Sequence, residues 1–188
     1  INKIMEYDWF QVNFLGCFLN LDFAIKKELN LRKYTLNEPP VTPRVLHHWY
    51  QVGIISDRRT NGKGWSKFSF TELVWIKVII RLREFGLSLD KIKKAKEDLI
   101  KYAVKDTHSM FPLLDFYLLY ARSYKHSVEL RIFEDGHLLL GREAELKNAR
   151  HHQKYAKDFI TLSLNEVIKE VIRKVSARYL LDPREEVQ

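Results

Sequence analysis

Cationic and imidazole side chains gather between residues 41 and 70 of this 188-residue chain. They are Arg44, His47, His48, Arg58, Arg59, Lys63 and Lys67. Cations that reach outward bind phosphate oxygens and give affinity for nucleic acid without reading its sequence, while imidazoles can donate to phosphates or to base edges. Because the group surrounds one predicted helix and one predicted turn, it favours nucleic-acid binding over a merely solvated face.

Three uncharged residues complete the candidate DNA-binding set. They are Thr42, Tyr50 and Trp65. The Tyr50 hydroxyl can donate to a phosphate, although core packing explains this ring equally well. For Trp65 we favour packing of the turn against its domain over stacking on a base.

No other constellation in the sequence points to catalysis or to a bound group. There is no Ser/His/Asp set, no paired-carboxylate setting and no zinc-ligand spacing, and the GKG at residues 62–64 lacks the Ser/Thr and helix context of a phosphate-cradling loop. His47 and His48 make a poor metal pair, since neighbours on a helix point about 100° apart. A single cysteine, Cys17, rules out an intrachain disulfide. We therefore predict no enzymatic activity, no cofactor and no metal.

The overall charge and hydropathy agree with a nucleic-acid partner. The formal net charge of +8 favours polyanions. No uninterrupted apolar run is long enough to span a bilayer, and Glu6 and Asp8 lie where a secretion signal would be apolar. These features predict a cytoplasmic protein without a membrane partner.

The predicted helix that carries the first of the cationic side chains is well delimited. Thr42 suits the N-cap, Pro43 suits the first helical position, where a missing N–H costs nothing, and Gly53 suits the C-terminal end. Helical spacing separates an inner side from an outer side. The inner residues are Val45, Leu46 and Trp49, and the outer residues are Arg44, His47, His48 and Gln51.

Periodicity predicts three more helices and a loop in the first half of the chain. The first helix spans Asp22 to Asn30, and residues 31–42, which contain two prolines, are predicted to form a loop. The second helix has Thr71 as its cap and stops at Gly86. The third is capped by Ser88 and presents a solvated outer face of lysines. These are Lys91, Lys93, Lys94 and Lys96.

The second half is predicted to contain an apolar helix, a hairpin and an amphipathic helix. Residues 110–124 leave almost no polar side, which favours an oligomer interface or a contact between domains. Alternating apolar residues around Asp-Gly at 135–136 predict a hairpin. Residues 159–162 suggest a strand, and Ser163 with Glu166 forms a capping box that opens the last helix. The candidate dimerisation residues are Phe111, Leu114, Leu118, Leu119, Val167 and Val171.

Residues 41 to about 99 resemble the MerR family of winged helix-turn-helix regulators. The family's recognition-helix segment is similar to VTPRVLHHWYQVGII, and its wing is similar to SDRRTNGKGWSKFSFTEL. Its later pair of helices resembles IIRLREFGLSLDKIKKAKEDL. The resemblance implies dimeric binding to inverted repeats of duplex DNA, with the recognition helix in the major groove and the wing on the flanking backbone. It also implies association with the bacterial nucleoid.

The chain departs from the family pattern at several places. His47 and His48 stand where the family often has Arg and Tyr, and Ser66 replaces a common wing Arg. A loop at residues 31–41 separates the candidate first helix from the recognition helix. The second half goes to a hairpin and a capped helix, whereas family members tend to end in a long antiparallel coiled coil.

Together these features predict a mainly α fold with small antiparallel β elements (α+β). A winged helix-turn-helix DNA-binding domain with an N-terminal extension would occupy residues 1–103, and a dimerisation and effector domain residues 104–188. The predicted function is sequence-specific binding of double-stranded DNA by a homodimer that regulates transcription, with no effector identified. Two alternatives stay open. One is a winged-helix protein-interaction module, and the other is a ligand-responsive sensor with a pocket among Phe116, Tyr117 and Tyr120.

Overall fold

The computed structural model describes residues 23–35, 41–57, 59, 66–100, 110–124, 126–149 and 158–181. These ranges contain seven helices and two small antiparallel sheets, so the predicted fold class is confirmed. The predictions made for residues 1–22, Cys17 included, lie outside the described residues. None of the helices in the described ranges is both long and apolar enough to cross a membrane.

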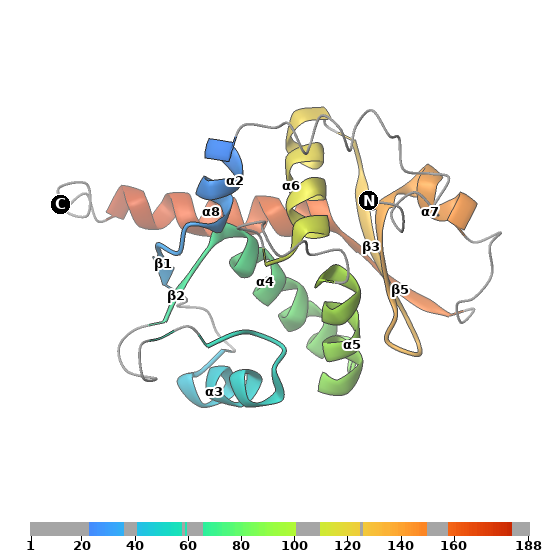
Figure 1. Cartoon of the computed structure of the whole chain (residues 1–188), viewed down its shortest axis with the longest axis horizontal. Coiled ribbons are helices and arrows are strands. Elements are labelled where there is room, and N and C mark those ends of the chain that lie inside the picture. The colour runs from blue at the N-terminus through green and yellow to red at the C-terminus, as the bar shows by residue number, and fades with distance from the viewer. Residues whose placement is uncertain are drawn as a thin grey trace.

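Twelve elements follow one another along the described chain (Figure 1). The first half contains α2 (Phe23–Asn30), β1 (Tyr34–Thr35), α3 (Pro43–Val52), β2 (Lys67–Phe68), α4 (Phe70–Glu84) and α5 (Leu89–Ile100). The second half contains α6 (Pro112–Tyr124), β3 (Val128–Phe133), β4 (Leu138–Arg142), α7 (Glu143–Ala149), β5 (Phe159–Ser163) and α8 (Leu164–Leu181). The helix predicted from Asp22 to Asn30 is confirmed as α2.

The smaller sheet joins segments on either side of α3. Strands β1 and β2 are antiparallel, with Tyr34 opposite Phe68 and Thr35 opposite Lys67. The prediction of an uninterrupted loop over residues 31–42 is therefore wrong at β1. Within the described residues β2 pairs with β1 and with no strand of residues 54–57. The strand that follows the basic segment is thus held by a partner from before α3, a pairing that no local pattern predicts.

The start of α4 corrects the predicted cap. Ser69 is the N-cap: its Oγ accepts from the Glu72 N–H at 3.1 Å, and the Glu72 carboxylate accepts from the Ser69 N–H at 2.8 Å. This reciprocal pair satisfies two backbone donors that the first helical turn leaves open. Thr71, which we predicted as the cap, is buried two residues further on and donates its hydroxyl to the buried Asp115 carboxylate of α6.

The hydrophobic core is built around α4 and crosses from one half of the chain to the other. Val74, Trp75 and Ile76 are fully buried. The same cluster of buried residues contains Trp49 of α3 and Val171 of α8. The division of the chain at residues 103 and 104 stays a prediction, and a continuous core spans it.

The apolar helix α6 lies between the two halves. It packs against α4 and α5 from the first half and against β4 and α8 from the second. Five of the six predicted dimerisation residues are buried in this intrachain core, and Leu119 is partly buried against it. The buried residues are Phe111, Leu114, Leu118, Val167 and Val171. These residues therefore pack within the chain, and both the contact between domains and the oligomer interface stay predictions.

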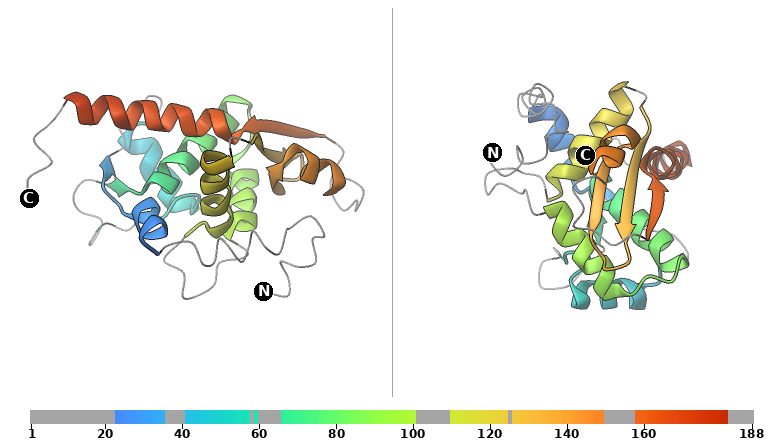
Figure 2. Two further views of the ribbon diagram at one scale, coloured as in Figure 1. Left: turned by 90° about the horizontal axis from the view of Figure 1, so that it is seen from above. Right: turned by 90° about the vertical axis from the view of Figure 1, so that its right-hand side faces the viewer.

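The larger sheet has the strand order β4-β3-β5 and contains the predicted hairpin. Its turn is closed by the Gly136 N–H, which donates to Phe133 O at 2.9 Å. Strand β5 leads directly into α8, and the two run in line along one side of the molecule (Figure 2). Half of the predicted capping box forms there, since the Ser163 hydroxyl accepts from the Glu166 N–H at 3.4 Å while the Glu166 carboxylate pairs with Lys169.

Candidate nucleic-acid interface

Helix α3 has the predicted boundaries and the predicted caps. The Thr42 hydroxyl accepts from the Val45 N–H at 3.3 Å, and Pro43 occupies the first turn. Gly53 ends the helix in the left-handed region, with φ of 84°, and its N–H donates to Trp49 O at 3.1 Å. Thr42, a predicted DNA-contact residue, therefore acts in this structure as the cap that fixes where α3 begins.

The inner side of α3 anchors the helix to the body of the molecule. Trp49 is 5% exposed, and Val45 and Leu46 are partly buried against the same core. The two residues after the helix are also held, since Trp75 Nε1 donates to Ile54 O at 2.9 Å and Lys96 Nζ donates to Gly53 O at 2.8 Å. The orientation of α3 is thus set by contacts along its inner side and at its C-terminal end.

The outer side of α3 is open. Its exposed polar side chains recur at helical spacing, as predicted, and form what we call the outer face of α3. They are Arg44, His47, His48 and Gln51. Arg44 has no ion-pair partner among the residues that the structure describes. The helix itself lies at one edge of the molecule, with α4 and α5 between it and α6 (Figure 1, Figure 2).

Tyr50 and Arg59 are brought together in a small internal cluster. The Tyr50 hydroxyl donates to Ser66 Oγ at 2.8 Å, and the Arg59 guanidinium lies 5.4 Å from the centre of the Tyr50 ring. Arg59 also donates to both carboxylate oxygens of Asp57, from Nε at 2.9 Å and from Nη2 at 2.7 Å. Of the two uses that the sequence allowed for Tyr50, this structure shows packing and an internal hydrogen bond.

Within the cluster the positive charge of Arg59 is balanced by the negative charge of Asp57. The hydrogen bonds from Arg59 lower the pKa of the Asp57 carboxyl to about 2, so that Asp57 is ionised at neutral pH. Burial raises the pKa of the Tyr50 hydroxyl, which keeps it protonated and able to donate to Ser66. Ser66, which stands where the family often has Arg, thereby joins the segment before β2 to α3. Arg59 is paired with the Asp57 carboxylate and packs on the Tyr50 ring. The exposed Arg44 has no such acidic partner among the described residues.

The remaining predicted contacts are divided between the surface of β2 and the undescribed segment. Lys67 is exposed on β2, while its neighbour Phe68 is 1% exposed and points into the core. Arg58, Lys63 and Trp65 lie outside the described residues.

Two functionally placed cations were missed by the sequence analysis. Arg32 Nε pairs with Glu72 Oε2 at 2.9 Å, and its guanidinium lies 5.8 Å from the centre of the Phe68 ring, so it fastens the β1–β2 sheet to the start of α4. Lys96, predicted on the solvated face of α5, is 8% exposed and bound to Gly53 O. The Ser-x-x-Glu signal at 69–72 could have located the Glu72 carboxylate, but nothing local marks Arg32 or Lys96.

The aromatic residues proposed as a ligand pocket contact one another. The Phe116 and Tyr117 rings meet edge to face at 4.8 Å between centroids, and the Tyr120 ring lies 5.6 Å below the Arg142 guanidinium. The Tyr117 hydroxyl donates to Glu145 at 3.3 Å, and burial raises its pKa well above the ordinary value. Core packing therefore explains these rings. Within the described ranges no group of three or more His, Cys, Asp or Glu side chains could hold a metal ion.

A comparison with protein families identifies one segment of the chain. Residues 40–99 match the model of the MerR HTH family regulatory protein, a range that contains α3, β2, α4 and all but the last residue of α5. No curated protein and no solved structure matches the chain. Regulators of this family are generally non-enzymatic proteins that bind DNA and control transcription. Residues 40–99 are therefore a MerR HTH family domain.

Proposed function

We propose that the chain binds duplex DNA in a sequence-specific manner and regulates transcription, with α3 in the major groove. The observation that carries this proposal is the contrast between the two sides of α3. Its inner side is anchored by Trp49, while its outer face exposes Arg44, His47, His48 and Gln51. Imidazoles and the Gln51 amide can form hydrogen bonds with base edges, and a fixed helix can bring them to the same bases at every binding event. The Arg44 guanidinium can bind a backbone phosphate beside them.

The flanking backbone would be contacted by cations from β2 and from the basic segment before it. Lys67 is exposed at the start of β2 and supports this part of the proposal. Arg58 and Lys63 complete it as predictions from sequence, with Trp65 as a packing residue. Such contacts supply affinity and register without sequence information.

We further propose that the chain acts as a homodimer, because one helix of this length reads few bases and two half-sites multiply specificity. The buried positions of Phe111, Leu114 and Leu118 give them an indirect role in such a dimer. They would fix α6, and Val167 and Val171 would fix α8, so that other residues of these helices could meet the second subunit.

The proposal is tested by selecting duplexes from a random library with the full chain and measuring affinity at two salt concentrations. We expect enrichment of an inverted repeat, and an affinity that falls as salt rises because phosphate contacts release counterions. Arg44→Ala should weaken binding, whereas Lys93→Ala, which removes an exposed cation from α5, is the matched control. A chain that enriches no duplex and shows no salt-dependent binding would contradict the proposal and favour a protein-interaction role.

A further inference from the structure

Lys96 differs from the other lysines of α5 in its surroundings. Lys93 is exposed, whereas Lys96 is 8% exposed and directs its ammonium toward the end of α3. Its Nζ lies 2.8 Å from the carbonyl oxygen of Gly53, the residue that caps the C-terminus of α3. Removing an ammonium from water is costly unless it is hydrogen-bonded, so this contact must offset part of that cost.

The end of a helix is a favourable place for such a charge. The last carbonyl groups of a helix have no intrahelical partner and carry a partial negative charge, which a nearby cation stabilises. Here α5 supplies Lys96 to Gly53 O, and α4 supplies Trp75 to the next carbonyl, Ile54 O, at 2.9 Å. Two donors on two helices of the family domain therefore hold consecutive carbonyls directly after the recognition helix.

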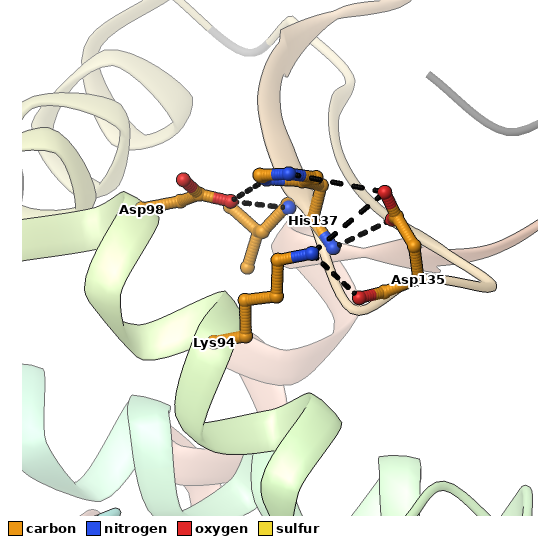
Figure 3. A network of polar contacts seen from close by, with 5 residues as sticks. Lys94, Asp98, Asp135 and His137 are labelled. Carbon is orange, nitrogen blue, oxygen red and sulfur yellow. Dashed lines mark hydrogen bonds and ion pairs between the residues drawn. The ribbon is translucent and has the colours of Figure 1, made fainter.

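The opposite side of α5 is fixed as well (Figure 3). Asp98 Oδ2 accepts from the Leu138 N–H at 2.9 Å and lies 3.0 Å from His137 Nδ1. Lys94 Nζ donates to Asp135 O at 2.9 Å. Residues two apart on a helix point about 200° from one another, so Lys94 and Asp98 face the β3–β4 turn while Lys96 faces α3.

We propose that Lys96 is a positioning residue for DNA recognition. It fixes the C-terminal end of α3 against a helix that the β3–β4 turn holds in place, and so sets the angle at which the outer face of α3 meets the bases. Lys96 itself is buried and contacts no phosphate. Its loss should therefore reduce discrimination between sequences more than affinity for DNA in general, because base contacts specify and phosphate contacts do not.

The test compares Lys96→Met with Lys93→Met in the full chain and uses two measurements. Only the first of them, on DNA affinity, rests on the proposed function. The first measurement is the ratio of affinities for the selected duplex and a scrambled duplex over a range of salt. For Lys96→Met we expect this ratio to fall about tenfold, the consequence of losing one hydrogen bond to a charged group, with an unchanged salt slope. Lys93→Met should keep the ratio.

The second measurement needs no DNA. Amide hydrogen exchange of Gly53 and Ile54, whose N–H groups both donate to Trp49 O, should be faster in Lys96→Met than in the wild-type chain and unchanged in Lys93→Met. If the wild-type chain selects no duplex, the proposed function fails, and this exchange measurement still decides whether Lys96 holds the end of α3.

Three results would overturn the proposal. They are unchanged exchange at Gly53 and Ile54, an unchanged affinity ratio in a Lys96→Met chain that folds, and a salt slope reduced by about one, which would mean a direct phosphate contact. If Lys96→Met does not fold, both measurements are made on Lys96→Gln, whose amide nitrogen ends one atom short of the lysine ammonium, so that both the charge and the reach to Gly53 O are lost. An unchanged ratio and unchanged exchange in that variant would also contradict the proposal.

Discussion

The outer face of α3 and the junction between α5 and the β3–β4 turn contain similar kinds of side chains. The first offers Arg44, His47 and His48, and the second contains Lys94 and His137. On α3 these groups are exposed. At the junction Lys94 donates to Asp135 O, and His137 lies between the carboxylates of Asp98 and Asp135.

The difference comes from the acidic residues nearby. Helix α3 contains no Asp or Glu, so its cation keeps its charge available for an outside partner. Helix α5 contains Asp98 at hydrogen-bonding distance from the turn, and the turn itself contributes Asp135. Changes at the junction should therefore alter the stability of the fold, and changes on the outer face of α3 should alter binding.

The largest expected effect is at the junction, in Gly136→Ala. Gly136 has φ of 88°, and a Cβ there would lie 3.0 Å from both Cα and O of Lys91. Left-handed strain of about 1–2 kcal/mol and overpacking of about 1–3 kcal/mol should together lower the free energy of unfolding by about 3 kcal/mol in a urea titration.

Gly86→Ala is the matched control for that change. Gly86 has φ of 82°, but a Cβ there meets nothing within 4 Å. It should show the backbone strain alone, about 1 kcal/mol. Equal losses in the two variants would mean that the β3–β4 turn does not press against α5.

The next effect separates the two regions directly, through Asp98→Ala and His48→Ala. Asp98→Ala leaves the Leu138 N–H without its acceptor and should lower the free energy of unfolding by about 1–2 kcal/mol. His48→Ala should leave stability within about 0.5 kcal/mol of the wild type, because this side chain is exposed.

DNA affinity should show the reverse order for these two variants. His48→Ala should weaken binding to the selected duplex, since the proposed groove contact is lost. The distinction between a binding region and a stabilising region would be wrong if His48→Ala kept the wild-type affinity for the selected duplex and Asp98→Ala kept the wild-type free energy of unfolding.

The sequence predicted those features that depend on neighbouring residues. Thr42 and Gly53 delimit α3, and the Asp-Gly pair at 135–136 marks the turn between β3 and β4. Caps and tight turns are formed by residues a few positions apart, so their chemistry can be read locally. The Ser69 cap obeyed the same rule and was missed only because Thr71 was preferred.

The remaining features depend on partners far along the chain. Lys96 meets Gly53 O across 43 positions, and Arg32 meets Glu72 across 40. A lysine in a run of lysines is usually solvated, and only the packing of α5 against the end of α3 buries this one. The same limit applies to α6, whose apolar residues could be assigned to a core or to an interface only once the fold was known.

A smaller effect is expected on the outer face of α3, in Arg44→Ala. The loss of one phosphate contact should weaken binding about equally for the selected and the scrambled duplex and reduce the salt slope by about one. Urea unfolding should stay within about 0.5 kcal/mol of the wild type, because Arg44 is exposed and has no ion-pair partner among the described residues. A change confined to the selected duplex would instead assign Arg44 to a base.

The smallest effect concerns Arg59. It lies close to α3, like the exposed groups of the outer face, and yet it is paired with a carboxylate, like the groups at the junction. Its hydrogen bonds lower the pKa of Asp57 from 3.8 to about 2, so the pair stabilises the folded chain above pH 3.8 and this contribution is lost as the pH falls through about 2. The effect on unfolding should be slight, since ion pairs near the surface contribute little. An NMR titration of the Asp57 carboxyl measures it directly, and Arg59→Ala should return the midpoint to about 3.8. A midpoint already near 3.8 in the wild-type chain would place Arg59 with Arg44, as a cation whose charge is available to phosphate before DNA arrives.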